Sequence, residues 1–180
     1  EPGSTAASTL PLQDILVTDG VFTAFGPGLA QQYEAQGGDL AAIEVVDLGG
    51  KLVCPPFCDT HLHLDYVFTA RKPGAVNESG TLFEGIQRWS ETKSDLTVDE
   101  IKQRAKIGIK KEMLHGVQLI RSHADVTDPN LTSLKALLEL KEELKDTVTL
   151  QIVSFPQEGM YSYEGPHGES GAELVEEGLK

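Results

Sequence analysis

Cysteine is scarce in this sequence, with only Cys54 and Cys58 among 180 residues. Two cysteines do not make a disulfide framework, although a single bond between them stays open, and a reducing cytoplasmic setting is favoured. A zinc knuckle needs further ligands at paired spacing, which the sequence lacks. We therefore expect both cysteines to be small buried residues of a cytoplasmic protein.

Positive charge, long apolar runs and targeting signals are also in short supply. The 15 Lys and Arg residues against 28 Asp and Glu give a net charge of −13, without a basic cluster. Nucleic-acid binders need a basic face, so nucleic acid is excluded as the main partner. No apolar run could span a bilayer, and residues 1–13 read as a trimmed or flexible start, not a signal peptide. A small neutral or cationic molecule is the ligand expected for a chain with this net negative charge. A homo-oligomer is compatible with the composition.

The first part of the chain is punctuated by glycine and proline and has no strong helical periodicity. Asp19-Gly20 joins two apolar runs and predicts a β-hairpin, because both turn positions must accept positive φ. Gly49-Gly50 repeats this pattern between Ile43–Leu48 and Lys51–Cys54. Residues 1–57 therefore predict a β-rich segment, part of a small β-sandwich domain.

From residue 58 onward, strand and helix patterns alternate. The strand candidates are Asp59–Leu64, Val117–Arg121 and Thr147–Phe155, and the last two are as apolar as strands buried on both faces. Helices are expected from the capping box Thr81–Glu84, from the capping box Thr97–Glu100 to about Leu114, from about Leu131 to Lys145, and from residue 169. This alternation predicts right-handed crossovers and a parallel sheet, an α/β fold.

Polar residues gather where these strands end, which is where parallel α/β sheets bind ligands. His61 and His63 are separated by one residue, so on a strand they share a side with Cβ atoms roughly 6.6 Å apart. Two imidazoles at that spacing can bind one metal ion. His123 ends the second strand, as a third ligand or as a donor to Asp125, and these two alternatives stay open. A catalytic metal needs at least three protein groups, which the chain does not visibly supply.

These residues carry a resemblance to a known family. The stretch "KLVCPPFCDTHLHLD" resembles the opening of the amidohydrolase superfamily barrel, where a small β domain leads into a first strand with H-x-H. The stretches "SGTLFEGIQRW", "RSHADVTDPNLTSLKALLELKEEL" and "LQIVSFPQEGMYSY" are similar to those of bacterial cytosine deaminases. The resemblance implies that residues 58–180 are the first three β/α units of a (β/α)₈ TIM-type barrel, which stays incomplete in this chain.

The resemblance also implies a chemistry and roles for particular residues. It makes His61 and His63 ligands of one catalytic divalent metal ion, iron or zinc, and it makes Gln157, Leu82 and His123 substrate-binding residues. A side-chain amide such as that of Gln157 offers a donor and an acceptor together, which suits a pyrimidine edge. The implied reaction is hydrolytic deamination of cytosine or a closely related aminopyrimidine. The family's proton-shuttling Glu is expected beyond Lys180, so catalysis by this chain alone is doubtful.

Two rival interpretations remain from the sequence. The substrate could be another cyclic amidine (isocytosine, creatinine or a triazine), because the pocket residues that decide it would lie on later strands. Alternatively, the chain is a non-catalytic fragment or binding module that uses the polar faces of its helices, although such faces are usually just solvated.

Overall fold

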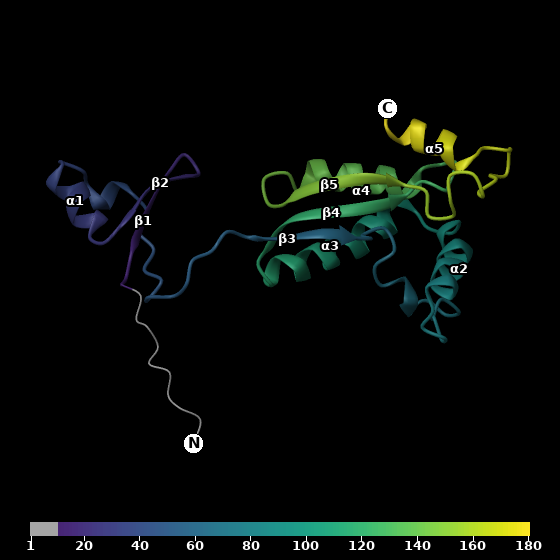
Figure 1. Cartoon of the computed structure of the whole chain (residues 1–180), viewed down its shortest axis with the longest axis horizontal. Coiled ribbons are helices and arrows are strands. Elements are labelled where there is room, and N and C mark those ends of the chain that lie inside the picture. Colours follow the sequence, from purple (N-terminus) through teal and green to yellow (C-terminus); the bar gives the residue numbers. More distant parts are fainter. Residues whose placement is uncertain (1–10) are drawn as a thin grey trace, which may run out of the picture. The chain divides into compact units, whose positions relative to one another are not determined.

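A computed structural model describes residues 11–180 of the chain (Figure 1). Residues 1–10, most of the start expected to be flexible or trimmed, lie outside the described residues. The chain divides into two compact units, the first ending at Cys54 and the second spanning Pro55–Lys180. Within residues 11–180, the helices are all too short or too polar to cross a membrane.

The first unit contains the predicted hairpin. Strands β1 (Asp14–Thr18) and β2 (Val21–Gly26) pair antiparallel, and the turn residues Asp19 and Gly20 have φ values of 52° and 75°. This turn confirms the prediction, because Asp and Gly tolerate the left-handed region that a two-residue hairpin needs. A helix, α1 (Leu29–Ala35), and the short 3₁₀ helix η1 (Leu40–Ala42) follow, and neither was predicted.

The second predicted hairpin, Ile43–Leu48 with Lys51–Cys54, is wrong. Gly49 and Gly50 do form a turn with positive φ, yet no strand forms on either side of it. A two-stranded hairpin is marginal unless one face packs against something. Here Val45 and Leu52 are exposed, so within residues 11–180 the apolar side chains of this segment have no surface to pack against.

The second unit is built on a three-stranded parallel sheet in the order β3-β4-β5. Its strands are β3 (Phe57–Leu62), β4 (Val117–Asp125) and β5 (Thr149–Phe155). The predicted parallel sheet is confirmed, although β4 runs four residues further than expected and β3 ends before His63. The extension of β4 carries "SHAD" into the strand itself.

Four α-helices accompany this sheet: α2 (Leu82–Lys93), α3 (Val98–Leu114), α4 (Thr132–Glu143) and α5 (Gly171–Gly178), with a 3₁₀ turn, η2 (Thr69–Arg71), before α2. Helices α3 and α4 pack on each other and on the sheet (Figure 1). The Thr97–Glu100 capping box opens α3 as predicted, and a further one, Ser170 with Glu173, opens α5. The four helices confirm the sequence pattern to within about three residues at each end.

The core lies on one face of the sheet. In β4 the alternate residues Ile120, Ser122 and Ala124 are fully buried, whereas Arg121 is exposed and His123 is half-buried on the opposite face. The sequence predicted strands buried on both faces, but within residues 11–180 the His123 face is only partly covered. The face that carries the histidine is therefore open in this chain.

Two adjacent leucines of α4 test where the core is. Leu137 is 0 % exposed and Leu138 is 47 % exposed, so they differ in burial and not in chemistry. We expect Leu137→Ala to lower the free energy of unfolding by about 2 to 5 kcal/mol through lost burial and a residual cavity. Leu138→Ala, the matched control, should change it by about 0.5 kcal/mol or less. Urea denaturation measures both, and equal losses would contradict the packing described here.

Both cysteines are exposed and free, so the prediction that they are buried is wrong. Cys58 lies on β3, which pairs only with β4 in the described part of the chain. An edge strand with one open side leaves its small side chains accessible even where their chemistry suits a core.

Candidate functional site

Three histidines gather at the carboxyl ends of β3 and β4. His61 lies on β3, His63 follows one residue after its end, and His123 lies on β4. The ring centroids are 5.3 Å apart for His61 and His63, 4.2 Å for His61 and His123, and 5.6 Å for His63 and His123. The one-residue spacing thus brings the two imidazoles together although β3 ends at Leu62.

The ring of His63 is held in a defined orientation. Its Nδ1 donates a hydrogen bond to the His123 carbonyl oxygen at 3.1 Å, while Tyr66 stacks on the ring at 4.6 Å and Phe155 meets it edge-on at 5.5 Å. Because a carbonyl oxygen only accepts, Nδ1 carries the proton and Nε2 keeps its lone pair. Metal-binding histidines are typically oriented in this way, through the nitrogen that does not bind the ion.

Burial favours neutral imidazoles at this site. It is the main cause that lowers the pKa of His63 and that of His123, and the nearby His61 charge lowers both pKa values further. The hydrogen bond from His63 to the His123 carbonyl partly opposes this by raising the pKa of His63. A neutral imidazole is the form that binds a metal ion.

The described residues fit half of a catalytic metal site. His63 offers a free Nε2, with His61 beside it. Within residues 11–180, however, no group of three or more His, Cys, Asp or Glu side chains is arranged to hold a metal ion. His61 and His123 instead stack face to face, with ring centroids 4.2 Å apart and an interplanar angle of 22°. The described residues therefore do not show His123 as a third ligand.

Asp125 does not pair with His123 either. Nδ1 of His123 is buried and has no hydrogen-bond partner in the described part of the chain. The Asp125 carboxylate accepts instead from Trp89 Nε1 at 2.6 Å and from Lys93 Nζ at 3.1 Å. The described residues show neither of the two arrangements, a third ligand or a donor to Asp125, and the role of His123 as a substrate contact stays a prediction.

A second buried carboxylate ties the ends of β3 and β4 together. Oδ2 of Asp65 accepts the Asp125 N–H at 2.9 Å, and the neighbouring Leu64 N–H donates to Ser122 Oγ at 3.0 Å. Burial, reinforced by the charge of Asp125, raises the pKa of Asp65 to about 7. These links anchor the turn that follows His63 to β4.

Gln157 lies just past the end of β5, where the sequence placed it. Its main-chain N–H donates to Asp125 Oδ1 at 3.3 Å, and its side chain is half-buried. Phe155, two residues earlier, contacts the rings of His63 and His123 at 5.5 Å each. The segment that carries Gln157 therefore adjoins the histidines.

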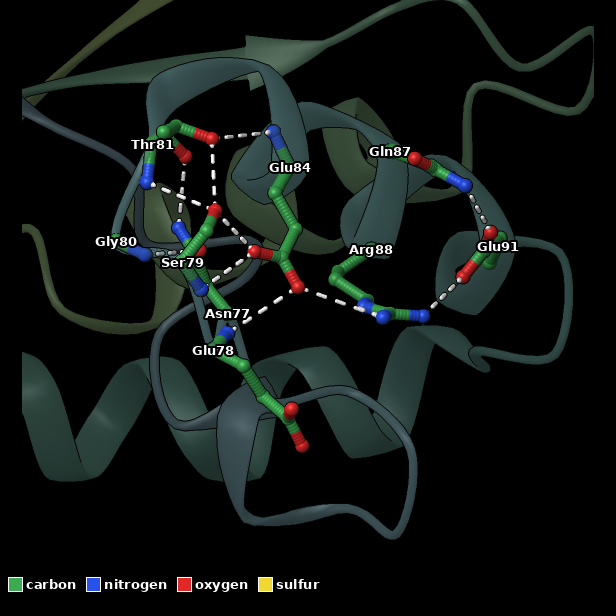
Figure 2. Close-up of polar contacts among 9 residues, drawn as sticks. All are labelled: Asn77, Glu78, Ser79, Gly80, Thr81, Glu84, Gln87, Arg88 and Glu91. Atoms are coloured by element: carbon green, nitrogen blue, oxygen red, sulfur yellow. Dashed lines mark hydrogen bonds and ion pairs between the residues drawn. The ribbon is translucent and has the colours of Figure 1, made fainter.

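Leu82 is the first residue of α2 and is largely exposed. The loop before it, residues 77–81, is ordered by two side chains (Figure 2). Asn77 accepts from the Gly80 N–H and donates to the Thr81 carbonyl, both at 2.9 Å. Glu84 accepts the N–H groups of Glu78 at 3.1 Å and Ser79 at 2.7 Å, together with the Ser79 hydroxyl.

The predicted capping box at the start of α2 is only half formed. Thr81 Oγ1 accepts the Glu84 N–H at 3.3 Å, as the first half of a capping box requires. The Glu84 side chain, however, reaches past the N-cap to the loop. It does so because two main-chain N–H groups and a hydroxyl there offer more donors than the single Thr81 N–H.

Glu84→Gln is expected to loosen the 77–81 loop, because the amide keeps one acceptor oxygen and loses the charge. We expect hydrogen exchange of the Ser79 amide to accelerate by up to about tenfold, as for the loss of one hydrogen bond. Glu91→Gln is the matched control, since Glu91 also pairs with Arg88 but does not touch the loop. Equal exchange rates in the two variants would contradict the role of Glu84 in ordering the 77–81 loop.

The pH dependence of this loop follows from the same contacts. The Ser79 hydroxyl, and then the Ser79 and Glu78 N–H groups, lower the pKa of Glu84 to about 2. A carboxyl whose folded pKa is depressed stabilises fully above its unfolded value, about 4.3, and the effect is lost as the pH falls through the folded value. NMR titration of the Ser79 amide should therefore show the loop intact at pH 4 and released near pH 2.

Sequence reasoning missed the side chains that surround Asp125. Trp89 is buried, as an aromatic side chain on a helix commonly is, but its indole N–H also donates a hydrogen bond to Asp125. Lys93 lies in the last turn of α2 and forms an ion pair with Glu158. The only signal was an acidic residue two positions after His123, which could not reveal partners more than 30 residues away.

Parallel strands joined by helices define an α/β protein, a class in which ligands bind at the carboxyl edge of the sheet, and this is the edge where the histidines and Gln157 lie. The chain belongs to the amidohydrolase family, whose profile matches residues 44–177. Among curated proteins it is 35% identical over 120 residues to N-isopropylammelide isopropyl amidohydrolase of Pseudomonas sp. (strain ADP), covering 64% of this chain and 30% of that protein.

Two further comparisons point the same way. The chain is 27% identical over 152 residues to pterin deaminase of Rhizobium rhizogenes (strain K84 / ATCC BAA-868), covering 82% of this chain and 32% of that protein. It is also similar to the crystal structure of 5-methylcytosine deaminase from Klebsiella pneumoniae liganded with 5-fluorocytosine, with a TM-score of 0.73 and 40% identity, covering 92% of this chain and 37% of that one. The chain thus spans about a third of the length of these relatives.

Proposed function

We propose that this chain is part of a metal-dependent amidohydrolase that removes the amino group of cytosine, or of a closely related aminopyrimidine, as ammonia. The observation that carries the proposal is the pair His61 and His63 at the end of β3, with His63 oriented by the His123 carbonyl. The likeness to a 5-methylcytosine deaminase at 40% identity supports it. Residues 58–180 would be the first three units of a (β/α)₈ barrel, and residues 1–57 part of a small β domain.

In this proposal the chain supplies two ligands and the recognition of the base. His61 and His63 would hold one divalent ion, iron or zinc, which when bound lowers the pKa of a water molecule and so supplies hydroxide at neutral pH. The hydrogen bond from His63 Nδ1 fixes its ring. The side-chain amide of Gln157 would bind the ring edge, the main chain at Leu82 would contact the base, and His123 would line the same pocket. The proton-shuttling Glu would belong to later strands.

The substrate is the finer part of the proposal. The relatives include an enzyme named for N-isopropylammelide and a pterin deaminase. Other cyclic amidines therefore remain alternative substrates. The whole protein that carries this chain should be assayed for ammonia release from cytosine, 5-methylcytosine, isocytosine, creatinine and pterin, and for isopropylamine release from N-isopropylammelide. Turnover of the two cytosines well above the others supports the proposal, whereas preference for a triazine or a pterin would replace its substrate.

The rival of a non-catalytic module is separated from the enzyme by metal analysis. An enzyme of this kind should contain about one iron or zinc ion per chain as purified. Absence of a stoichiometric metal together with no turnover of any ring in the panel would favour the module.

A further inference from the structure

A single buried carboxylate, that of Asp125, accepts hydrogen bonds from three separate segments. Its Oδ2 accepts from Trp89 Nε1 at 2.6 Å and from Lys93 Nζ at 3.1 Å, both on α2. Its Oδ1 accepts from the Thr127 N–H at 2.8 Å, the Thr127 hydroxyl at 2.6 Å and the Gln157 N–H at 3.3 Å. The side chain is 1% exposed, so these protein groups replace water as its partners.

Lys93 makes a second connection between the same segments. Besides Asp125, its Nζ contacts Glu158 in an ion pair and donates to Thr127 Oγ1 at 2.8 Å. The Lys93 side chain is 12% exposed, so its charge is largely removed from water and depends on these two carboxylates. Helix α2 is therefore joined to the loop after β5 at two residues. It is joined to Gln157 through Asp125, and to Glu158 directly through Lys93.

Only a carboxylate can serve all of these donors. An ionised Asp is an acceptor at both oxygens, whereas the isosteric Asn has one acceptor oxygen and an NH₂ group that donates. In either orientation, the side-chain amide introduced by Asp125→Asn would turn its NH₂ toward the donors on α2 or toward those of Thr127 and Gln157. One set of hydrogen bonds would then be lost, and the NH₂ group of the new side chain would face the N–H or O–H groups that had donated to Asp125.

We propose that Asp125 is a positioning residue for substrate recognition, which holds Gln157 and helix α2, beginning at Leu82, in fixed places beside the strand that carries His123. The proposal rests on the proposed function, because Gln157 and Leu82 are there the residues that contact the base. Asp125 itself touches neither base nor metal in this scheme. It acts through the main chain of Gln157 and through the indole and ammonium groups of α2.

The test is Asp125→Asn in the whole protein, with kinetics, metal content and hydrogen exchange measured together. We expect KM for the base to rise roughly tenfold with kcat within about threefold of the wild type, the pattern of lost substrate binding. Metal content should stay unchanged, and exchange in residues 156–160 should become about tenfold faster. Adding Gln157→Ala to Asp125→Asn should change KM by no more than about twofold beyond Gln157→Ala alone, because both act on one contact.

Two lysines provide a matched control. Lys102 is 14% exposed and pairs with Glu139 and Glu143 on α4, so it resembles Lys93 in burial and in having two carboxylate partners. Lys93→Gln should raise KM and speed exchange in residues 156–160, whereas Lys102→Gln should do neither. The inference is overturned if Asp125→Asn and Lys93→Gln resemble Lys102→Gln in both measurements. If Asp125→Asn does not fold, the comparison with Lys102→Gln is made with Lys93→Gln and with Trp89→Phe, which removes the indole donor together with part of the ring.

Failure of the proposed function would look different. A wild-type protein that turns over no base in the panel defeats the proposed deamination, and hydrogen exchange then decides alone: unchanged exchange in residues 156–160 of Asp125→Asn overturns the positioning role. An active wild type in which the effects of Asp125→Asn and Gln157→Ala on KM multiply independently overturns the positioning of Gln157 by Asp125 and leaves the deamination intact.

Discussion

His63→Ala is expected to empty the metal site and lower the deamination rate by at least about 10³-fold, because generation of hydroxide at neutral pH is lost with the ion. The change also removes the donor to the His123 carbonyl, so the end of β4 loses a contact of 3.1 Å. His61→Ala should have the same effect on metal content. Elemental analysis of the purified protein and ammonia release measure both consequences.

The chain offers a matched control for this experiment. His115 is exposed, and its Nδ1 also lies within hydrogen-bond distance of a carbonyl oxygen, that of Lys111 at 2.7 Å. His115→Ala should therefore leave metal content and turnover unchanged. A His63→Ala protein that keeps a full complement of metal and normal turnover would remove the metal-ligand role and, with it, the proposed function.

Gln157→Ala is expected to lower kcat/KM for the base by about 10- to 100-fold, mainly through KM, since a polar ring edge loses its hydrogen-bond partner in a half-buried site. Metal content should not change, because Gln157 is not a proposed ligand. Steady-state kinetics on the preferred base, with elemental analysis, provide the measurement.

Gln151 is the matched control for this substitution. It lies on β5, six residues before Gln157, is exposed, and accepts from Arg121 Nε at 3.0 Å. Gln151→Ala should leave the kinetics unchanged. Equal losses in the two variants would show that the substitutions disturb β5 as a whole and would contradict recognition by Gln157.

The two loops that carry the proposed base contacts, those at Leu82 and Gln157, are held by different means. The loop before Leu82 is ordered from within, by Asn77 and Glu84, over fewer than ten residues (Figure 2). The loop that carries Gln157 is held by Asp125 and Lys93, which are distant in the sequence. Local order of the first kind leaves a trace in the sequence, such as a capping residue, whereas order of the second kind leaves none.

Local patterns predicted most of the second unit. Strands β4 and β5 follow from apolar runs, and α3 from a capping box, because these signals act within a few residues. The same reasoning failed for Ile43–Cys54, where a hairpin needs a partner surface that residues 11–180 do not give it. It failed as well for α1, a helix of 7 residues that buries no side chain and lies among glycines.

The sequence by itself determined the parallel β/α order and the closeness of His61 and His63, because the two residues are separated by only one position. Only the tertiary structure decided that His63 donates to the His123 carbonyl, that His123 stacks on His61, and that Asp125 serves α2 and Gln157. Those contacts join residues about 30 to 60 positions apart. They depend on the register of β3 and β4 and on where α2 lies against the strand ends, neither of which any short stretch of sequence encodes.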